Sequence, residues 1–387
     1  MLPLHTAAFH PAYAGLPAVA PAQPVGDTWQ PDVLGPGFVA RTITVPRGSG
    51  IATLIRHVPE DDPQAIPTPW KGRGWAMLYV HGWNDYYFQR ELARHVSAAG
   101  GSFYAIDLHH YGRSLREGDM PGWCTSMGDF APDLHVALQY IAEEHPDTPV
   151  ILTGHSTGGL LAALWAIHRP RSIAGMWLTS PWLELQPGPR RRQTYHRVLR
   201  VASTFGAARE IPMASDRSYA RSMEGWNRDA VPMPTEYVEA GYEGDPSLSG
   251  FTLINDWKRA EGNPVRAGWL YAVTSGHTEI AAADPIDVPL LLHAAEQTYH
   301  SEGDEWDPQL LMSDAVLTTK YLVAAGSTLS TDVTIKRRPM RHDPFLSLPD
   351  VRQAVWHDFH AWSARTLPGL APSPDQLGEA ATYAICP

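Results

Sequence analysis

The segment Gly154-His155-Ser156-Thr157-Gly158 has the residue types and spacing that allow a serine to act as a nucleophile. Small residues on both sides permit a turn so tight that a Cβ would collide with neighbouring backbone. Such a turn between a strand and a helix lifts the serine oxygen clear of the sheet edge. The helix N-terminus behind it offers free N–H groups to a developing oxyanion. Apolar residues 149–153 precede the segment and apolar residues 158–167 follow it, so the sequence predicts a nucleophile at Ser156.

A second turn, His81-Gly82-Trp83, directly follows the apolar residues 75–80. A strand that ends beside the nucleophile can donate a second backbone N–H to the oxyanion, and Gly82 lets the chain bend inward. We therefore expect the backbone N–H groups of Trp83 and Thr157 to form an oxyanion hole. An ordinary glycine turn at the end of a strand is the alternative interpretation.

A serine hydroxyl needs a general base, and the base needs an acid that orients it. His342 lies in the loop after residues 332–337, the last predicted strand, where the base is expected. A histidine in a surface loop is the alternative interpretation. The acid should follow the predicted strand at residues 288–293. In many enzymes that combine a serine, a base and an acid, an aliphatic residue stands two positions after the acid. Among the carboxylates that follow this strand, only Asp314 has such a neighbour. Asp314 is therefore favoured, with Asp304 second and Glu296 third.

Predicted strands and helices alternate around these residues, which indicates a parallel sheet with helices on both faces. One helix is expected to carry Phe88, Leu92 and Val96, with Asn84 or Asp85 as its N-cap. The alternation stops at Pro181 and resumes near residue 286. We predict an N-terminal extended arm (1–34), a core (35–180 and 286–366), an inserted cap (181–285) and a C-terminal tail (367–387).

Composition excludes several classes of function. The formal net charge of −11 argues against a nucleic-acid partner, whose phosphates require a basic face. Two cysteines, Cys124 and Cys386, are too few for a disulfide framework or a thiolate zinc site. The first residues lack the pattern of a signal peptide, and no run of about 18 apolar residues occurs. We expect a cytoplasmic protein without a membrane span.

Two groups of residues have the side-chain types of metal ligands, but neither has a complementary ligand that the sequence identifies. They are Asp107 with His109 and His110, and His357 with Asp358 and His360. A loop turn and a solvated helix face are the simpler interpretations, and we expect no metal and no cofactor. The arginines at positions 190, 191, 192, 197 and 200 are expected to lie on a solvated helix face, with an anionic substrate group or lipid headgroup as the alternative ligand.

The stretch from residue 75 to about 180 contains HGW, DLHHYGRS and GHSTGG in that order, and it resembles monoacylglycerol lipases and bacterial lysophospholipase-like hydrolases. The resemblance implies an α/β-hydrolase fold with a mostly parallel, eight-stranded sheet. It also implies hydrolysis of a small-molecule carboxylic ester, often one with a lipid-like acyl group. Two features depart from the family: a His and a Tyr replace small residues in DLHHYGRS, and about twenty residues separate the strand at 288–293 from Asp314. The rival hypotheses are an amidase or peptidase with the same triad, a hydrolase of another bond, and an inactive binding protein.

Overall fold

One large sheet organises the molecule. The computed structural model describes residues 26, 28–45, 50–70, 74–212, 217–226, 232–301 and 307–377. Within these ranges nine strands form one sheet in the order β1-β2-β3-β5-β4-β6-β7-β8-β9. The strands β1, β2, β3 and β5 pair antiparallel, and the pairs from β5 to β9 are parallel. The strands are β1 (Gln30–Pro31), β2 (Phe38–Thr44), β3 (Ile51–His57), β4 (Trp75–Val80), β5 (Gly101–Asp107), β6 (Val150–His155), β7 (Gly175–Thr179), β8 (Leu290–Ala295) and β9 (Val333–Arg338).

The sheet has nine strands where eight were expected, and β1 is the additional one. Gln30 and Pro31 pair with Ala40 and Val39 of β2, so part of the predicted extended arm belongs to the sheet. A strand of two residues that contains a proline carries no alternating pattern for the sequence to reveal. Residues 1–25 of that arm lie outside the described residues.

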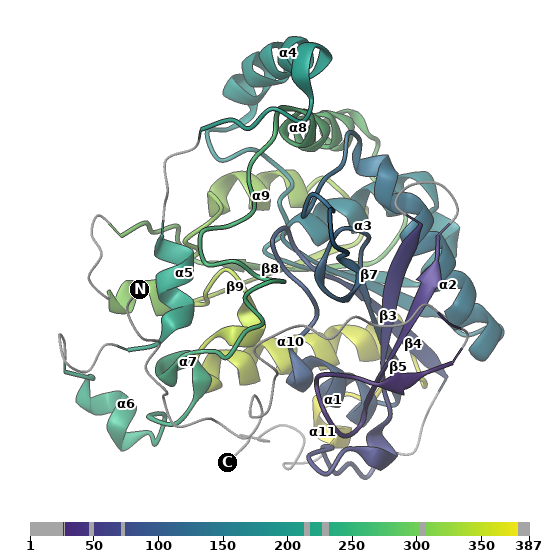
Figure 1. The fold of residues 1–387 in the computed structure, drawn as a ribbon. Helices are drawn as coiled ribbons and strands as arrows, with labels where there is room; N and C mark the ends of the chain where they lie inside the picture. The colour runs from purple at the N-terminus through teal and green to yellow at the C-terminus, as the bar shows by residue number, and fades with distance from the viewer. Residues whose placement is uncertain are drawn as a thin grey trace.

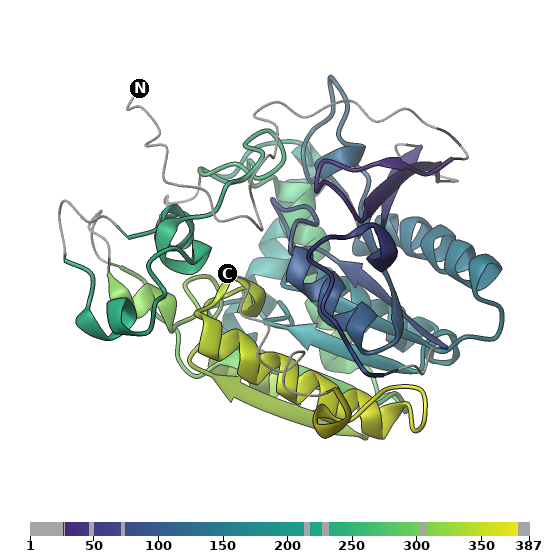
Figure 2. The ribbon, with the colours of Figure 1, turned by 90° about the horizontal axis from the view of Figure 1, so that it is seen from below.

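The central strands are buried on both faces because their sequences are continuous apolar runs. Every residue of β4, β6, β7 and β8 is buried. Two hydrophobic cores lie on opposite sides of the sheet. Side chains of α2 (Ala131–Glu144), α3 (Thr157–His168) and α9 (Thr319–Gly326) contribute to one core, and those of α1 (Arg90–Ala98) and α10 (Pro349–Thr366) to the other. Figures 1 and 2 show this layered arrangement.

Helix α1 begins later than the sequence suggested. Its first residue is Arg90 and its N-cap position is Gln89, so neither Asn84 nor Asp85 caps it. Asn84 hydrogen-bonds instead with Arg259, and Asp85 pairs with Lys258. The segment between the HGW turn and α1 therefore faces the insertion, a contact that helical periodicity could not reveal.

Helix α10 buries Val351, Val355, Phe359 and Trp362, as its predicted apolar stripe requires. The chain continues to pack beyond the predicted boundary at residue 366. Leu367 and Ala371, which follow α10, are buried in the same core as that helix. Leu377, the last residue of α11 (Pro374–Leu377), is buried there too.

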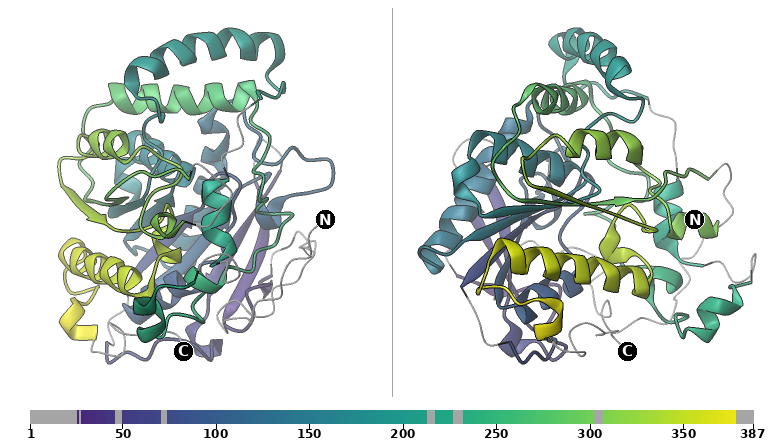
Figure 3. Two further views of the ribbon diagram at one scale, coloured as in Figure 1. Left: turned by 90° about the vertical axis from the view of Figure 1, so that its left-hand side faces the viewer. Right: turned by 180° about the vertical axis from the view of Figure 1, so that it is seen from behind.

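The described part of the insertion at residues 181–285 consists of helices joined by irregular segments. It contains α4 (Pro189–Gly206), α5 (Ser218–Glu224), α6 (Thr235–Glu239), α7 (Pro246–Ser249) and α8 (Ala267–Ala282). Helix α4 lies outermost, beyond α8 (Figures 1 and 3). Four of its arginines are exposed as predicted, namely those at positions 190, 191, 197 and 200. Arg192 is buried instead, where it donates to Glu184 and Thr278.

Helix α4 also carries most of the exposed large apolar side chains of the described chain, namely Tyr195, Val198, Val201 and Phe205. None of the helices in the described ranges combines the length and the apolar composition that crossing a membrane requires.

Candidate active site

Ser156 occupies the turn between β6 and α3 in a conformation that L residues rarely adopt, with φ 53° and ψ −118°. Backbone hydrogen bonds to β7 and to the chain that follows it help to hold it there. The Ser156 N–H donates to the Thr179 carbonyl at 3.1 Å, and the Ser156 carbonyl accepts from the Trp182 N–H at 2.9 Å. Strained backbone of this kind persists only where surrounding structure enforces it, and it clusters at functional sites.

The glycines of the GHSTG segment are required by close backbone contacts. A Cβ at Gly158 would overlap the carbonyl oxygens of Val80 and His81, and a Cβ at Gly154 would overlap the Gly158 carbonyl. A Cβ at Gly82 would lie 3.1 Å from the Ser156 Cβ. The HGW turn therefore lies directly against the turn that carries the serine.

His342 is held by a buried carboxylate. Its Nδ1 lies 3.0 Å from each carboxylate oxygen of Asp314. Asp314 also accepts the backbone N–H groups of Val316 and Leu317 at 2.8 and 2.7 Å. Burial alone would raise the pKa of Asp314, but His342 and these N–H groups hold it below its ordinary value. An ionised acceptor keeps the His342 proton on Nδ1, which leaves Nε2 free to accept one.

The imidazole of His342 lies beside the residue that precedes the serine. The ring centroids of His342 and His155 are 4.8 Å apart. The structure thus brings His342 and Asp314 together and places the His342 ring next to the last residue of β6.

The long gap before Asp314 is an excursion that returns to the end of β8. The Asp314 N–H donates to the Gln297 carbonyl and the Tyr299 N–H donates to the Asp314 carbonyl, each at 3.0 Å. The returning chain pairs beside Thr298, so a carboxylate distant in sequence reaches the strand end. Glu296 is exposed, and its backbone pairs with Arg338. Asp304 lies outside the described residues.

The peptide that joins Gly82 to Trp83 is fixed by His81. The His81 Nε2 accepts the Leu108 N–H at 3.1 Å, so the proton lies on Nδ1, which donates to the Gly82 carbonyl at 2.7 Å. This hydrogen bond orients the peptide plane that contains the Trp83 N–H. In the part of the chain that the structure describes, neither the Trp83 N–H nor the Thr157 N–H donates a hydrogen bond to a protein acceptor.

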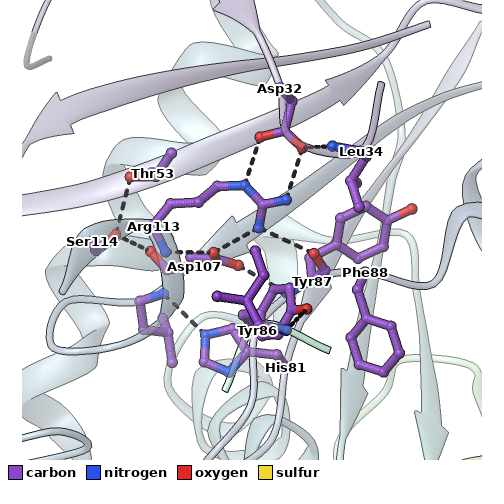
Figure 4. Close-up of polar contacts among 12 residues, drawn as sticks. Asp32, Leu34, Thr53, His81, Tyr86, Tyr87, Phe88, Asp107, Arg113 and Ser114 are labelled. Atoms are coloured by element: carbon purple, nitrogen blue, oxygen red, sulfur yellow. Dashed lines mark hydrogen bonds and ion pairs between the residues drawn. The ribbon is translucent and has the colours of Figure 1, made fainter. Parts of the chain in front are cut away.

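The DLHHYGRS loop is anchored by a buried ion-pair network (Figure 4). Arg113 donates to Asp32 at 2.6 and 2.8 Å, to Asp107 at 2.8 Å and to the Tyr87 carbonyl at 3.0 Å. The side chains of all three charged residues are fully buried. Asp107 is therefore a partner of Arg113, which accounts for its position without a metal.

Two more of the predicted metal ligands, His109 and Asp358, have protein partners. His109 pairs with Asp133 at 2.8 Å, and Asp358 pairs with Arg338 and His293. Asp358 and His360 are buried, so their face of α10 is not solvated as expected. Among the described residues no three His, Cys, Asp or Glu side chains approach closely enough to hold a metal ion.

Residues of the insertion that the sequence did not indicate also reach this region. The Tyr219 ring packs edge-on against His342, with centroids 5.6 Å apart and an interplanar angle of 88°. Lys258 contacts both Tyr219 and Asp85. Both residues come from the irregular insertion, where no periodic pattern or motif marks them.

Part of the chain is similar to known proteins. Residues 73–232 match the family model described as "Serine aminopeptidase, S33". The monoacylglycerol lipase of Mycolicibacterium smegmatis is 26% identical over 205 residues, which cover 52% of this chain and 63% of the relative. The human monoglyceride lipase is 34% identical over 125 residues, which cover 30% of this chain and 39% of the relative. The chain therefore spans less than two thirds of the length of these curated relatives.

Solved structures share the fold at low sequence identity. A soluble variant of monoglyceride lipase from Saccharomyces cerevisiae aligns with a TM-score of 0.53 and 15% identity, over 86% of this chain and 96% of the other. A carboxyl esterase from Bacillus coagulans aligns with a TM-score of 0.52 and 17% identity, over 84% and 96% of the two chains. The sheet and these matches together show that the chain has the α/β-hydrolase fold and is similar to monoacylglycerol lipases.

Proposed function

We propose that this protein is a serine hydrolase that cleaves carboxylic esters, with Ser156 as nucleophile, His342 as base and Asp314 as the orienting acid. The observation that carries the proposal is the His342 imidazole, held through Nδ1 by the buried Asp314 carboxylate at 3.0 Å beside the serine turn. That arrangement supports a role for His342 as a base that Asp314 orients, close to a serine in strained backbone.

The proposed reaction passes through an acyl-enzyme. The Ser156 oxygen attacks the ester carbonyl while the His342 Nε2 takes its proton, and the tetrahedral oxyanion accepts the N–H groups of Trp83 and Thr157. His342 then returns the proton to the departing alcohol. Water, activated by the same imidazole, releases the acid. Asp314 remains ionised throughout and keeps the imidazole in the required tautomer.

An acyl group that is apolar suits the surroundings of the serine. The backbone N–H of Trp182 donates to the Ser156 carbonyl, and the centroids of the Trp182 and Trp269 rings are 5.8 Å apart. Trp269 in turn stacks on Trp83, with ring centroids 4.8 Å apart. Aromatic residues of this kind commonly line pockets for apolar ligands. The names of the curated relatives, monoacylglycerol lipase and monoglyceride lipase, support a lipid-like ester as the substrate class.

Hydrolysis of an amide or peptide bond is the second candidate, because the matched family model is described as a serine aminopeptidase. Hydrolysis of p-nitrophenyl butyrate and of the matched p-nitroanilide separates the two. We expect the ester to be preferred, and a clear preference for the anilide would overturn the ester assignment.

Labelling with a fluorophosphonate tests the nucleophile itself. The wild type should label and Ser156→Ala should not, although the alanine variant should remain folded. A folded wild type that does not label would favour a binding protein that has lost catalysis.

Two matched variants test the acid. Asp314→Asn should lower kcat by about a thousandfold or more, because the amide favours the wrong tautomer of His342. Glu296→Gln changes an exposed carboxylate of the same loop and should leave kcat unchanged. The reverse result would move the assignment to Glu296.

A further inference from the structure

The loop that follows the HGW turn is bound to the insertion by hydrogen bonds that resemble backbone pairing. The Asn84 amide donates to the Arg259 carbonyl at 2.8 Å and accepts the Arg259 N–H at 3.1 Å. Asn84 has a φ of 54°, a conformation that asparagine tolerates better than most residues. The residue next to the proposed oxyanion donor Trp83 is therefore fixed by residue 259.

A buried ion pair lies beside this contact. The Lys258 ammonium is 2.7 Å from the Asp85 carboxylate, and the side chains are only 6% and 2% exposed. The ammonium also lies 5.4 Å from the centre of the Phe88 ring. The desolvation cost of burying two charges is offset only where the two groups pair with good geometry. The pair therefore favours one relative position of the loop and the insertion.

Tyr219 connects the ion pair to the proposed base. Its hydroxyl accepts a hydrogen bond from the Lys258 ammonium at 3.2 Å, and its ring meets the His342 ring edge-on at 5.6 Å. A continuous series of contacts thus runs from Asp85 through Lys258 and Tyr219 to His342.

We propose that Asp85, Lys258 and Tyr219 are positioning residues of the active site, in which the Asp85–Lys258 pair fixes the loop that carries Trp83 and Tyr219 fixes the ring of His342. The inference rests on the proposed function. It gives the insertion a role in the chemical step, because the insertion would hold both the Trp83 N–H and the His342 ring in the positions that the reaction requires.

A direct chemical role for Lys258 is excluded by its surroundings. Burial alone would lower the pKa of Lys258, but the neighbouring Asp85 and Tyr219 raise it well above its ordinary value. The amine therefore stays protonated and cannot act as a general base. Burial raises the pKa of Tyr219 to about 12, so its hydroxyl also stays neutral.

Two substitutions at Tyr219 separate its ring from its hydroxyl. With p-nitrophenyl butyrate, Tyr219→Leu should lower kcat about tenfold or more while KM changes less than about threefold, because the base is misplaced and ground-state binding is not. Tyr219→Phe keeps the ring against His342 and should retain kcat within about threefold. If Tyr219→Leu keeps its kcat, or loses activity only through KM, the role of Tyr219 is refuted.

A double-mutant cycle tests the ion pair. Asp85→Asn and Lys258→Met should each lower kcat about tenfold, and the double variant should be no worse than either, because all three lose the same constraint. Asn84→Gly removes the hydrogen bonds to Arg259, tolerates the φ of 54° and provides a milder test if a charge variant fails to fold. Glu210→Gln is the control, since Glu210 forms a surface pair with Arg266 elsewhere in the insertion. Additive losses, or unchanged kcat in folded variants, would overturn the proposal.

Hydrogen–deuterium exchange provides a readout that does not depend on catalysis. Peptides covering residues 82–86 should exchange faster in Lys258→Met than in the wild type, and equal exchange would count against the proposal. Fluorophosphonate labelling of the wild type distinguishes the two levels of inference. A wild type that does not label overturns the proposed function and this inference with it, whereas a labelled wild type with unaffected variants overturns this inference alone.

Discussion

Acidification from pH 7.5 to pH 5.5 should destabilise this protein strongly through three histidines that are buried without charge. Burial is the main cause that lowers the pKa of His155, His277 and His360, in each case to about 3. Below an ordinary pKa of about 6.5 the unfolded chain binds a proton at each position, whereas the folded chain does not until about pH 3. Stability is therefore complete above pH 6.5 and is lost as the pH falls toward 3.

The size of the effect follows from the difference in proton binding. At pH 5.5 each histidine lowers the free energy of unfolding by about 1.4 kcal/mol, so the three together account for about 4 kcal/mol. Domains of this kind have total stabilities of about 5–15 kcal/mol, so the loss should be large. Burial also lowers the pKa of His95, which adds to the effect, whereas burial raises the pKa of Asp343, which opposes it.

Urea denaturation followed by circular dichroism at the two pH values measures the loss. The carboxylates with lowered pKa values, such as Asp314, do not contribute at pH 5.5 because they protonate only at lower pH in either state. His360→Phe is the informative variant, since neither ring nitrogen of His360 has a partner among the described residues. It should reduce the difference between the two pH values by about 1.4 kcal/mol.

His135→Gln, at an exposed position of α2, should leave that difference unchanged. Equal stability of the wild type at pH 7.5 and 5.5 would refute the reasoning, as would an unchanged pH difference in His360→Phe.

Three further predictions concern backbone and charge. Gly158→Ala should prevent stable folding, because its Cβ would overlap the carbonyl oxygens of Val80 and His81, whereas Gly244→Ala meets no atom within 4 Å and should melt close to the wild type. Ser156→Gly should unfold at a higher urea concentration than Ser156→Ala, with a gain of about 1 kcal/mol, because glycine relieves the strained φ of 53°; equal midpoints would argue against strain. Arg113→Met should cost about 3–5 kcal/mol in chemical denaturation because it leaves Asp32 and Asp107 buried without a cation. Arg365→Met breaks exposed contacts with Asp332 and Thr334 and should cost less than about 1 kcal/mol; similar losses in the two variants would contradict the distinction.

The features that the sequence predicted are those with a local physical cause. The buried strands of the parallel sheet are continuous apolar runs, and the stripe of α10 follows helical spacing. The serine turn was recognisable because close backbone contacts require glycine at positions 154 and 158. Asp314 was favoured from its own neighbours, and the structure brings its carboxylate to His342.

The features that the sequence did not reveal depend on contacts between distant segments. Strand β1 is too short for a periodic pattern. Asn84 and Asp85 had the residue types of a helix cap, but Arg259 and Lys258 compete for the same side chains. Local sequence patterns cannot identify hydrogen-bond and ion-pair partners that lie more than 170 positions away.

The buried contact between Asp32 and Arg113 bears on how short a fragment of this chain can be and still fold by itself. Residues 73–232, which match the family model, include Arg113 but exclude Asp32. A polypeptide cut to that match would keep the pair between Arg113 and Asp107 but would lose the carboxylate that accepts two N–H groups of the buried guanidinium. We therefore expect a stably folded domain of this chain to begin before residue 32, well upstream of the serine turn.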